Sequence, residues 1–163
     1  MAIILQSTAF ENGAPIPAIH TGDGRDVSPP LCWSGLPDGV EELALIVEDP
    51  DAPCCAGGTG AAWVHWVIYR ISPATRELSQ AVPARVMLEK PVGAYQGVNS
   101  WGRIGYNGPA PPSGHGTHHY RFRLFALGRP LDLFHSLAAD AVDQAMHGHV
   151  LDTGLLVGTY ARP

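Results

Sequence analysis

Residues 63–71 read WVHWVIYRI, and β-branched and aromatic residues follow one another almost without interruption. A glycine-rich stretch precedes the run, and this composition predicts a buried strand. With a period of two, one face would hold Trp63, His65, Val67, Tyr69 and Ile71, and the other Val64, Trp66, Ile68 and Arg70. His65 is therefore a polar side chain on an otherwise apolar strand face.

Other segments with strand composition lie on both sides of this run. ELALIVED (42–49) is a short apolar segment that stops at the prolines of EDPDAP. HYRFRLFAL (119–127) predicts another strand. If the alternation is extended back to His118, one face holds His118, Tyr120, Phe122 and Leu124, and the opposite face holds His119, Arg121, Arg123 and Phe125. A last strand is expected in LLVGTYAR (155–162).

One helix is expected, over LAADAVDQAMH (137–147). Ser136 is placed to cap its first amides, Asp140 lies in the early turns, and Gly148 follows as a stop signal. No repeat or linker composition interrupts the chain. Residues 1–163 therefore predict a single, mainly all-β domain: a Greek-key β-sandwich of two antiparallel sheets with a short C-terminal helix.

The overall composition excludes several classes of protein. The net charge is −5 and no run of lysine or arginine occurs, which argues against nucleic-acid binding. No apolar run is long enough to span a bilayer, and the N-terminus lacks the basic start of a signal peptide. Cys32, Cys54 and Cys55 are an odd number of cysteines and favour free thiols in the cytoplasm. The role of Cys54 and Cys55 is left open.

Polar residues that a sandwich core does not explain fall in three places. Asp49 and Asp51 follow a strand in a proline-stiffened turn, and His65 lies within the next strand. The third place is GPAPPSGHGTHHY (108–120), which supplies His115, His118, His119 and Tyr120. Read singly, each has an ordinary structural explanation, such as a core histidine or a capped turn. Together, on rigid loops at strand ends, they favour a preformed binding site.

Metal binding and hydrolysis are the weaker interpretations of these residues. A zinc site drawn from His115, His118, Asp51 and one of the two adjacent cysteines lacks the tight ligand spacing of known zinc motifs. Strand alternation also sends His118 and His119 to opposite faces. A hydrolase built on Ser100 or Ser113 lacks a nucleophile-elbow motif. We therefore assign no metal, no cofactor and no catalytic residue.

Anion binding is the stronger interpretation. Imidazoles, a phenol hydroxyl and loop amides are all potential donors to a phosphate or carboxylate. Asp49 or Asp51 would favour the protonated, donating form of His65. An aspartate would also accept a hydrogen bond from an ammonium group. The residues thus suit a phosphate monoester or a zwitterion as well as a simple anion.

Three blocks of the sequence resemble the phosphatidylethanolamine-binding protein family, in its bacterial, Raf-kinase-inhibitor-like branch. They are DGRDVSPPLCWSGLPDGVEELALIVEDPDAP (23–53), WVHWVIYRI (63–71) and GVNSWGRIGYNGPAPPSGHGTHHYRFRLFAL (97–127). The closing GTYAR is similar as well. The order D-P-D-A-P, W-x-H-W and G-P-x-P-P-x-G-x(3)-H-x-Y is far more specific than any one of these motifs.

The resemblance implies a sandwich with a small anion pocket at one end. The matched positions are Asp49, Asp51, Pro53, Trp63, His65, Gly108, Pro109, Pro111, Pro112, His118 and Tyr120. It implies a non-enzymatic protein that binds a small phosphorylated or carboxylated ligand, with a regulatory role. The alternative is an inhibitor of a protease or kinase acting through the pocket rim, although the neutral segment CCAGGTGAA (54–62) argues against a kinase target. Bacterial relatives suggest a homodimer.

Overall fold

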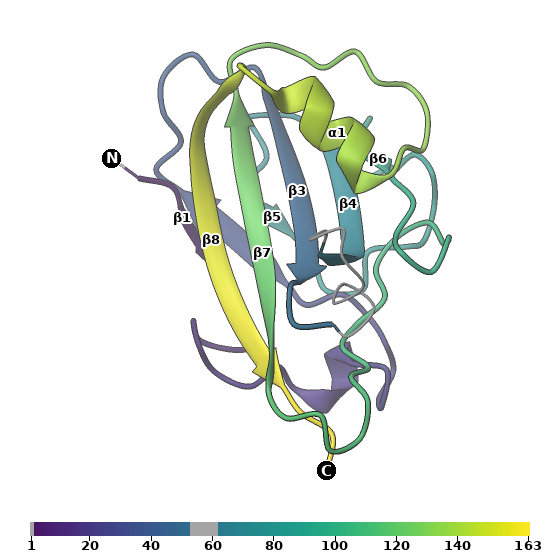
Figure 1. Cartoon of the computed structure of the whole chain (residues 1–163). Helices are drawn as coiled ribbons and strands as arrows, with labels where there is room; N and C mark the ends of the chain where they lie inside the picture. Colours follow the sequence, from purple (N-terminus) through teal and green to yellow (C-terminus); the bar gives the residue numbers. More distant parts are fainter. Residues whose placement is uncertain (1, 53–61) are drawn as a thin grey trace.

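A computed structural model of the chain describes residues 2–52 and 62–163. Within them, eight strands form two antiparallel sheets (Figure 1). The three-stranded sheet has the order β1 (Ile4–Gln6), β2 (Leu31–Ser34), β5 (Glu77–Leu78). The five-stranded sheet has the order β6 (Tyr95–Gln96), β4 (Trp63–Ile71), β3 (Glu42–Asp49), β7 (His118–Leu127), β8 (Val150–Tyr160). A 3-10 turn, η1 (Ala18–His20), and one helix, α1 (Ala139–Met146), complete the regular structure of the described residues.

The larger sheet contains the Greek-key connection expected from the sequence. β3, β4 and β6 lie side by side, and β7 then crosses back to pair with β3 on its other edge. All of these pairs are antiparallel, which is the 4-1-2-3 arrangement of a Greek key. The crossing matters for the site, because it brings the start of β7 next to the end of β3.

The two sheets pack against each other through one apolar core. Leu31 and Trp33 of the small sheet belong to the same buried cluster as Leu45 of β3 and Phe122 of β7. The Trp66 indole in this core donates to Gln96 Oε1 at 2.7 Å, so its polar atom is satisfied. The prediction of a β-sandwich is confirmed.

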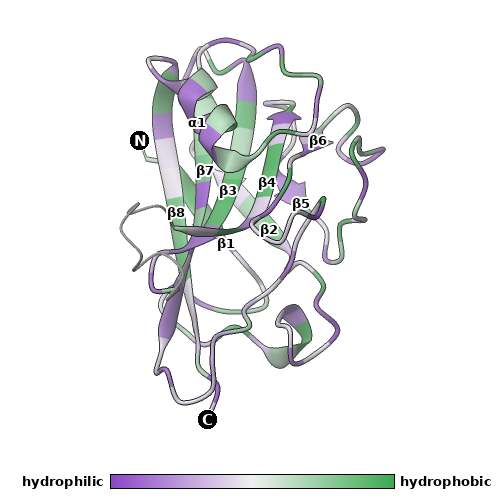
Figure 2. Ribbon diagram, turned by 45° about the vertical axis from the view of Figure 1, so that its right-hand side comes forward, coloured by the Kyte–Doolittle hydropathy of each residue, from purple (hydrophilic) through white to green (hydrophobic). Residues whose placement is uncertain are grey.

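The opposite face of the large sheet is covered by α1. Val142 and Met146 of the helix pack on a second buried cluster that includes Ile46, Val67 and Tyr69. Figure 2 shows the contrast between the largely hydrophobic β3, which is buried along its whole length, and α1, which carries hydrophilic as well as hydrophobic residues. Across the residues that the structure describes, no helix has the length and apolar character needed to cross a bilayer.

The prediction of a helix near the C-terminus is confirmed, but the predicted N-terminal cap is wrong. The helix begins at Ala139 after Ala138, without a side-chain cap. The Ser136 hydroxyl instead donates to the Gln96 carbonyl oxygen at 2.9 Å and joins the 130–138 segment to β6. Gly148 does follow the helix, with a φ of 81° that favours glycine.

Candidate functional site

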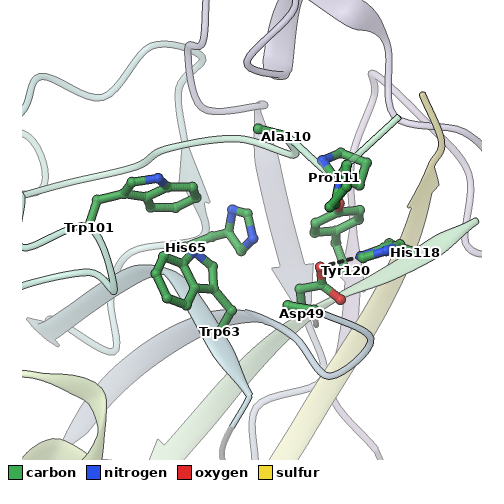
Figure 3. Close-up of a pocket in the computed structure, with 10 residues that line it drawn as sticks. Asp49, Trp63, His65, Trp101, Ala110, Pro111, His118 and Tyr120 are labelled. Atoms are coloured by element: carbon green, nitrogen blue, oxygen red, sulfur yellow. Dashed lines mark hydrogen bonds and ion pairs between the residues drawn. The ribbon is translucent and has the colours of Figure 1, made fainter. Parts of the chain in front are cut away.

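A cavity of about 200 Å³ opens at the end of the sandwich where β3 stops and β4 and β7 begin. Its described lining consists of Asp49, Ala52, Trp63, His65, Trp101, Ala110, Pro111, Pro112, His118 and Tyr120. Figure 3 shows Trp63, His65 and Trp101 on one side and Pro111, His118 and Tyr120 on the other. Seven of these residues were predicted from the sequence, and the structure brings them together.

A β-bulge turns His65 toward this cavity. Val47 of β3 pairs with Trp66, but the next residue, Glu48, pairs with Val64, so His65 is an extra residue in β4. A bulge places two consecutive side chains opposite one partner and shifts the alternation of the strand. The prediction that all odd residues from 63 to 71 share one face is therefore wrong.

A second irregularity lies near the other end of β4. Leu45 pairs with Ile68 and Leu43 with Ile71, and Arg70 between them has a φ of 57°. Val67 and Tyr69, which follow the bulge at His65, face α1, and beyond the second irregularity Ile71 returns to the inner core. By contrast, β7 has no irregularity opposite β3, and the predicted division of its residues is confirmed.

Asp49 and His118 form a buried pair at the base of the cavity. His118 Nδ1 lies 2.7 Å from Asp49 Oδ2, and both side chains are almost fully buried. Asp49 Oδ1 accepts a hydrogen bond from the Asp51 amide at 2.8 Å, so both carboxylate oxygens are occupied. Asp49 therefore fixes the orientation of the His118 ring.

The other nitrogen of His118 meets a histidine on the rim. His118 Nε2 lies 2.6 Å from His115 Nδ1. His115 is exposed, as expected, and stands between Gly114 and Gly116, which have φ values of 72° and 88°. An exposed side chain on a glycine-flanked segment thus occupies the ring atom that His118 would offer to a ligand.

His65 is held by backbone rather than by a carboxylate. Its Nδ1 lies 2.7 Å from the Asn107 carbonyl oxygen. Burial lowers the pKa of His65, and the opposing contributions of the Asn107 carbonyl and the Asp49 and Asp26 carboxylates are smaller. The expectation that Asp49 or Asp51 keeps His65 protonated is wrong, because desolvation outweighs these more distant charges.

The structure does not place Asp51 with the cavity residues. Its Oδ2 accepts hydrogen bonds from the His119 amide at 2.8 Å and from His119 Nδ1 at 2.9 Å on the outside of the sheet. Partial burial alone would raise the pKa of Asp51, but these two hydrogen bonds outweigh it and hold that pKa below its usual range. Asp51 instead ties the β3–β4 turn to β7.

Gly108 and Pro109 support the cavity from behind and do not line it. A Cβ on Gly108 would lie 2.1 Å from the His20 carbonyl oxygen, so only glycine allows this approach. The Gly108 amide donates to Asp26 Oδ1 at 2.6 Å, and the Pro109 oxygen accepts from the Gly22 amide at 2.8 Å. Pro53, the remaining predicted residue, lies outside the described residues, as do Cys54 and Cys55.

Trp101 lines the cavity and was missed by the sequence analysis. Its ring meets Trp63 edge-on with centroids 5.3 Å apart and His65 with centroids 5.0 Å apart. It remains 38% exposed at the mouth. The available signal was a large aromatic residue in the polar, glycine-containing segment NSWGR (99–103).

The site offers little support for the metal and hydrolase alternatives. Within residues 2–52 and 62–163, no group of three His, Cys, Asp or Glu side chains is arranged so that it could hold a metal ion. His118 and His119 lie on opposite faces of β7. The Ser100 hydroxyl accepts a hydrogen bond from the Val64 amide at 2.8 Å and holds the Trp101 segment against β4.

Comparison with known proteins agrees with the motif order. Residues 6–161 match the model of the family described as phosphatidylethanolamine-binding protein. A UPF0098 protein of Pyrococcus horikoshii is 45% identical over 156 residues, which cover 96% of this chain and 75% of the relative. The match to the family model, residues 6–161, includes every residue that lines the cavity.

Solved structures show the same fold. Escherichia coli YbcL, described as a member of the mammalian family, has 30% identity and a TM-score of 0.89 over 100% of both chains. The homologue CT736 of Chlamydia trachomatis has 36% identity and a TM-score of 0.86 over 99% of both. A carboxypeptidase Y inhibitor, solved with its cognate proteinase, shares the fold at 16% identity and a TM-score of 0.52, over 99% of this chain and 83% of the inhibitor.

Proposed function

Because the chain belongs to the phosphatidylethanolamine-binding protein family, we propose that it is a non-enzymatic binding protein for small phosphorylated or carboxylated ligands. One observation carries the proposal. Two imidazoles and a phenol from the starts of two strands, β4 and β7, converge on a cavity of about 200 Å³. This volume suits a headgroup-sized anion and is below the range of drug-sized sites.

The rigidity of the cavity supports this role. Asp49 fixes the ring of His118, the Asn107 carbonyl fixes the ring of His65, and Pro111 and Pro112 stiffen the facing wall. Side chains that are already oriented lose little conformational entropy when a ligand binds. A small ligand, which makes few contacts, needs this saving most.

Calorimetric titration with phosphate, phosphorylethanolamine and acetate tests the proposal. We expect saturable binding at millimolar or lower ligand concentration, weakened at least about tenfold in His65→Ala, which corresponds to about 1.4 kcal/mol. His147→Ala, which changes an exposed histidine just beyond α1, is the matched control. The absence of heat with all three ligands, together with unchanged behaviour of His65→Ala, contradicts the proposal.

A second proposal is that the cavity rim binds and inhibits a protease or kinase. The half-exposed Trp101 at the mouth supports it, since exposed tryptophans often anchor protein interfaces. The test is an inhibition assay with purified serine carboxypeptidases and protein kinases. Inhibition that is lost in Trp101→Ala supports the proposal, and full enzyme activity throughout contradicts it.

A further inference from the structure

The cavity histidines have already used one nitrogen each. His65 Nδ1 faces the Asn107 carbonyl oxygen, and His118 Nδ1 faces the Asp49 carboxylate, both at 2.7 Å. Carbonyl and carboxylate oxygens only accept hydrogen bonds, so each Nδ1 must carry the proton. A neutral imidazole has a single N–H, and its other nitrogen is then an acceptor. The protein therefore fixes the tautomer of both rings.

His65 is the clearer case, because its surroundings disfavour a second proton. Its ring is 2% exposed and is flanked edge-on by the rings of Trp101 and Tyr120. The charged groups near it are the carboxylates of Asp49 and Asp26, and burial lowers the pKa of His65 despite them. At neutral pH its Nε2 is an unprotonated acceptor.

This Nε2 is open to the cavity. None of the described residues forms a hydrogen bond with it, and it is not one of the polar atoms that are both buried and without a partner. The described polar side-chain atoms that are both buried and unpartnered are only the Nε atoms of Arg121 and Arg123, on the other face of the sheet. Because His65 lines the cavity, an entering ligand meets a lone pair there.

His118 also has an Nε2 that can accept a hydrogen bond, but the exposed His115 ring covers it. Its Nε2 is 2.6 Å from His115 Nδ1, and this contact holds one proton between two nitrogens. A ligand that displaces the exposed His115 ring meets the Nε2 of a ring whose Nδ1–H is already donated to Asp49. In the neutral ring this second atom is also an acceptor.

Apart from the two imidazoles, the lining holds both donors and acceptors: the indole N–H groups of Trp63 and Trp101 and the amides of Ala52 and Ala110 are potential donors. Asp49 contributes only acceptors, and Pro111 and Pro112 have no amide hydrogen. The Tyr120 hydroxyl is a donor, since burial raises its pKa far above the ordinary value and keeps the phenol protonated. A fully deprotonated oxyanion would set its lone pairs against those of the two imidazoles. A ligand with its own hydroxyl proton would satisfy them.

We propose that the cavity selects oxyanions that carry a proton, namely the monoanionic forms of phosphate monoesters and of inorganic phosphate, over sulfate and phosphodiesters. The P–OH group donates to His65 Nε2, and a phosphoryl oxygen accepts from the Tyr120 hydroxyl. The inference rests on the proposed anion-binding function and adds the protonation state of the ligand to it.

Titration of the wild-type protein with methyl phosphate, dimethyl phosphate and sulfate between pH 5 and 8 tests the inference. Methyl phosphate has a second pKa of about 6, whereas the other two ligands do not titrate in this range. At pH 6 we expect methyl phosphate to bind at least about tenfold more tightly, equivalent to about 1.4 kcal/mol. Its affinity should fall by up to about tenfold per pH unit above its pKa, as expected when one proton is linked to binding.

Each contrary outcome has a distinct meaning. If sulfate gains affinity at low pH in parallel with methyl phosphate, histidine protonation drives binding and the inference is overturned. If sulfate binds as tightly as methyl phosphate at every pH, the anion-binding function stands and the inference fails. If no ligand binds, the proposed function fails and the inference with it.

Nitrogen-15 NMR of the imidazole rings in the methyl phosphate complex gives a readout independent of affinity. We expect His65 as the neutral tautomer protonated on Nδ1, and an imidazolium signal for His65 in the complex overturns the inference. His65→Gln can turn an NH2 group toward the ligand, so the preference for methyl phosphate over sulfate should narrow severalfold. His147→Ala should leave that preference unchanged.

Discussion

Two successive residues of β3 carry buried carboxylates to opposite faces of the same sheet. Asp49 points into the sandwich and meets His118. Glu48 points outward, and its Oε1 lies 2.9 Å from Arg121 and 3.0 Å from Arg123. Both are acidic side chains paired with basic ones, yet only the pair at Asp49 borders a cavity with an unpartnered, titratable nitrogen.

The comparison shows why ionic clusters by themselves do not identify a site. A guanidinium group has only donors and no acceptor, so the hydrogen-bond roles in the cluster at Glu48 are fixed. Histidine changes between donor and acceptor, and the partner of one nitrogen decides the role of the other. The Asp49–His118 pair can therefore determine whether a ligand has to donate or accept a hydrogen bond. The Glu48 cluster can only form ion pairs.

The largest effect is expected from Asp49→Ala. The substitution leaves the buried His118 Nδ1–H and the Asp51 amide without acceptors, and one unsatisfied buried donor alone costs about 1–3 kcal/mol. We expect a loss of about 3 kcal/mol of unfolding free energy in urea and at least about tenfold weaker phosphate binding. Wild-type affinity in the folded variant would contradict the role of Asp49 in positioning His118.

The second effect is a loss of stability in mild acid that comes from His65. Because its pKa is lowered in the folded protein, the unfolded chain takes up a proton near its usual pKa of about 6.5 that the folded chain refuses. Unfolding free energy should fall by up to about 1.4 kcal/mol per pH unit below that value. Urea unfolding of wild type and His65→Gln between pH 7.5 and 5 measures this.

The loss of stability that comes from His65 can be separated from other acid effects by a control variant and by its pH range. His147→Ala should retain the wild-type slope, whereas His65→Gln should flatten it. The lowered pKa of Asp51 acts in the same direction but at lower pH: its stabilising contribution is complete above the unfolded value of 3.8 and is lost as the pH falls below that value. Equal slopes for wild type and His65→Gln above pH 5 would show that His65 is not held neutral.

A smaller effect is expected from Glu48→Ala. The side chains of Arg121 and Arg123 are 41% and 31% exposed, so water can replace much of what the carboxylate supplies. We expect a cost of about 1 kcal/mol in unfolding free energy, and phosphate affinity within about twofold of wild type. Loss of phosphate binding in this variant would mean that the two faces of the sheet are coupled.

The smallest effect, and the only gain, is expected from His115→Ala. An exposed hydrogen bond contributes little, about 0.5 kcal/mol, and the ligand no longer has to displace it. Phosphate should therefore bind about two- to threefold more tightly in calorimetry. Weaker binding in His115→Ala would instead identify His115 as a direct ligand contact.

The division of β7 was predictable from the sequence because the strand is regular where it meets β3. Its alternation correctly separated His118 and Tyr120 from His119 and Arg121. The same reasoning failed in β4, where a bulge at His65 and the positive φ of Arg70 shift the faces. Nothing in WVHWVIYRI marks either irregularity, because both depend on the register with β3.

The hydrogen-bond partners of the acidic residues were harder to predict than their positions on the strands. Asp51 follows Asp49 by two residues, and sequence reasoning gave them a common role. In the structure Asp51 bonds with His119 outside the sheet, and Asp49 bonds with His118 inside it. Asp26 accepts hydrogen bonds from the Gly108 amide and the Asn107 side chain. This supporting role was not predicted, because the two donors lie about 80 positions further along the chain.

The sequence by itself determined the four long strands of the larger sheet, their faces where pairing is regular, and the motif order that identifies the family, because these depend on local composition and on period. It did not indicate the short strands β1, β2, β5 and β6. The tertiary structure decided which nitrogen of each histidine carries the proton. That choice belongs to the Asn107 carbonyl and to the Asp49 carboxylate, 42 and 69 residues away from the rings they bind. Hydrogen-bond direction is set by the partner, and the partner is known only once the chain has folded.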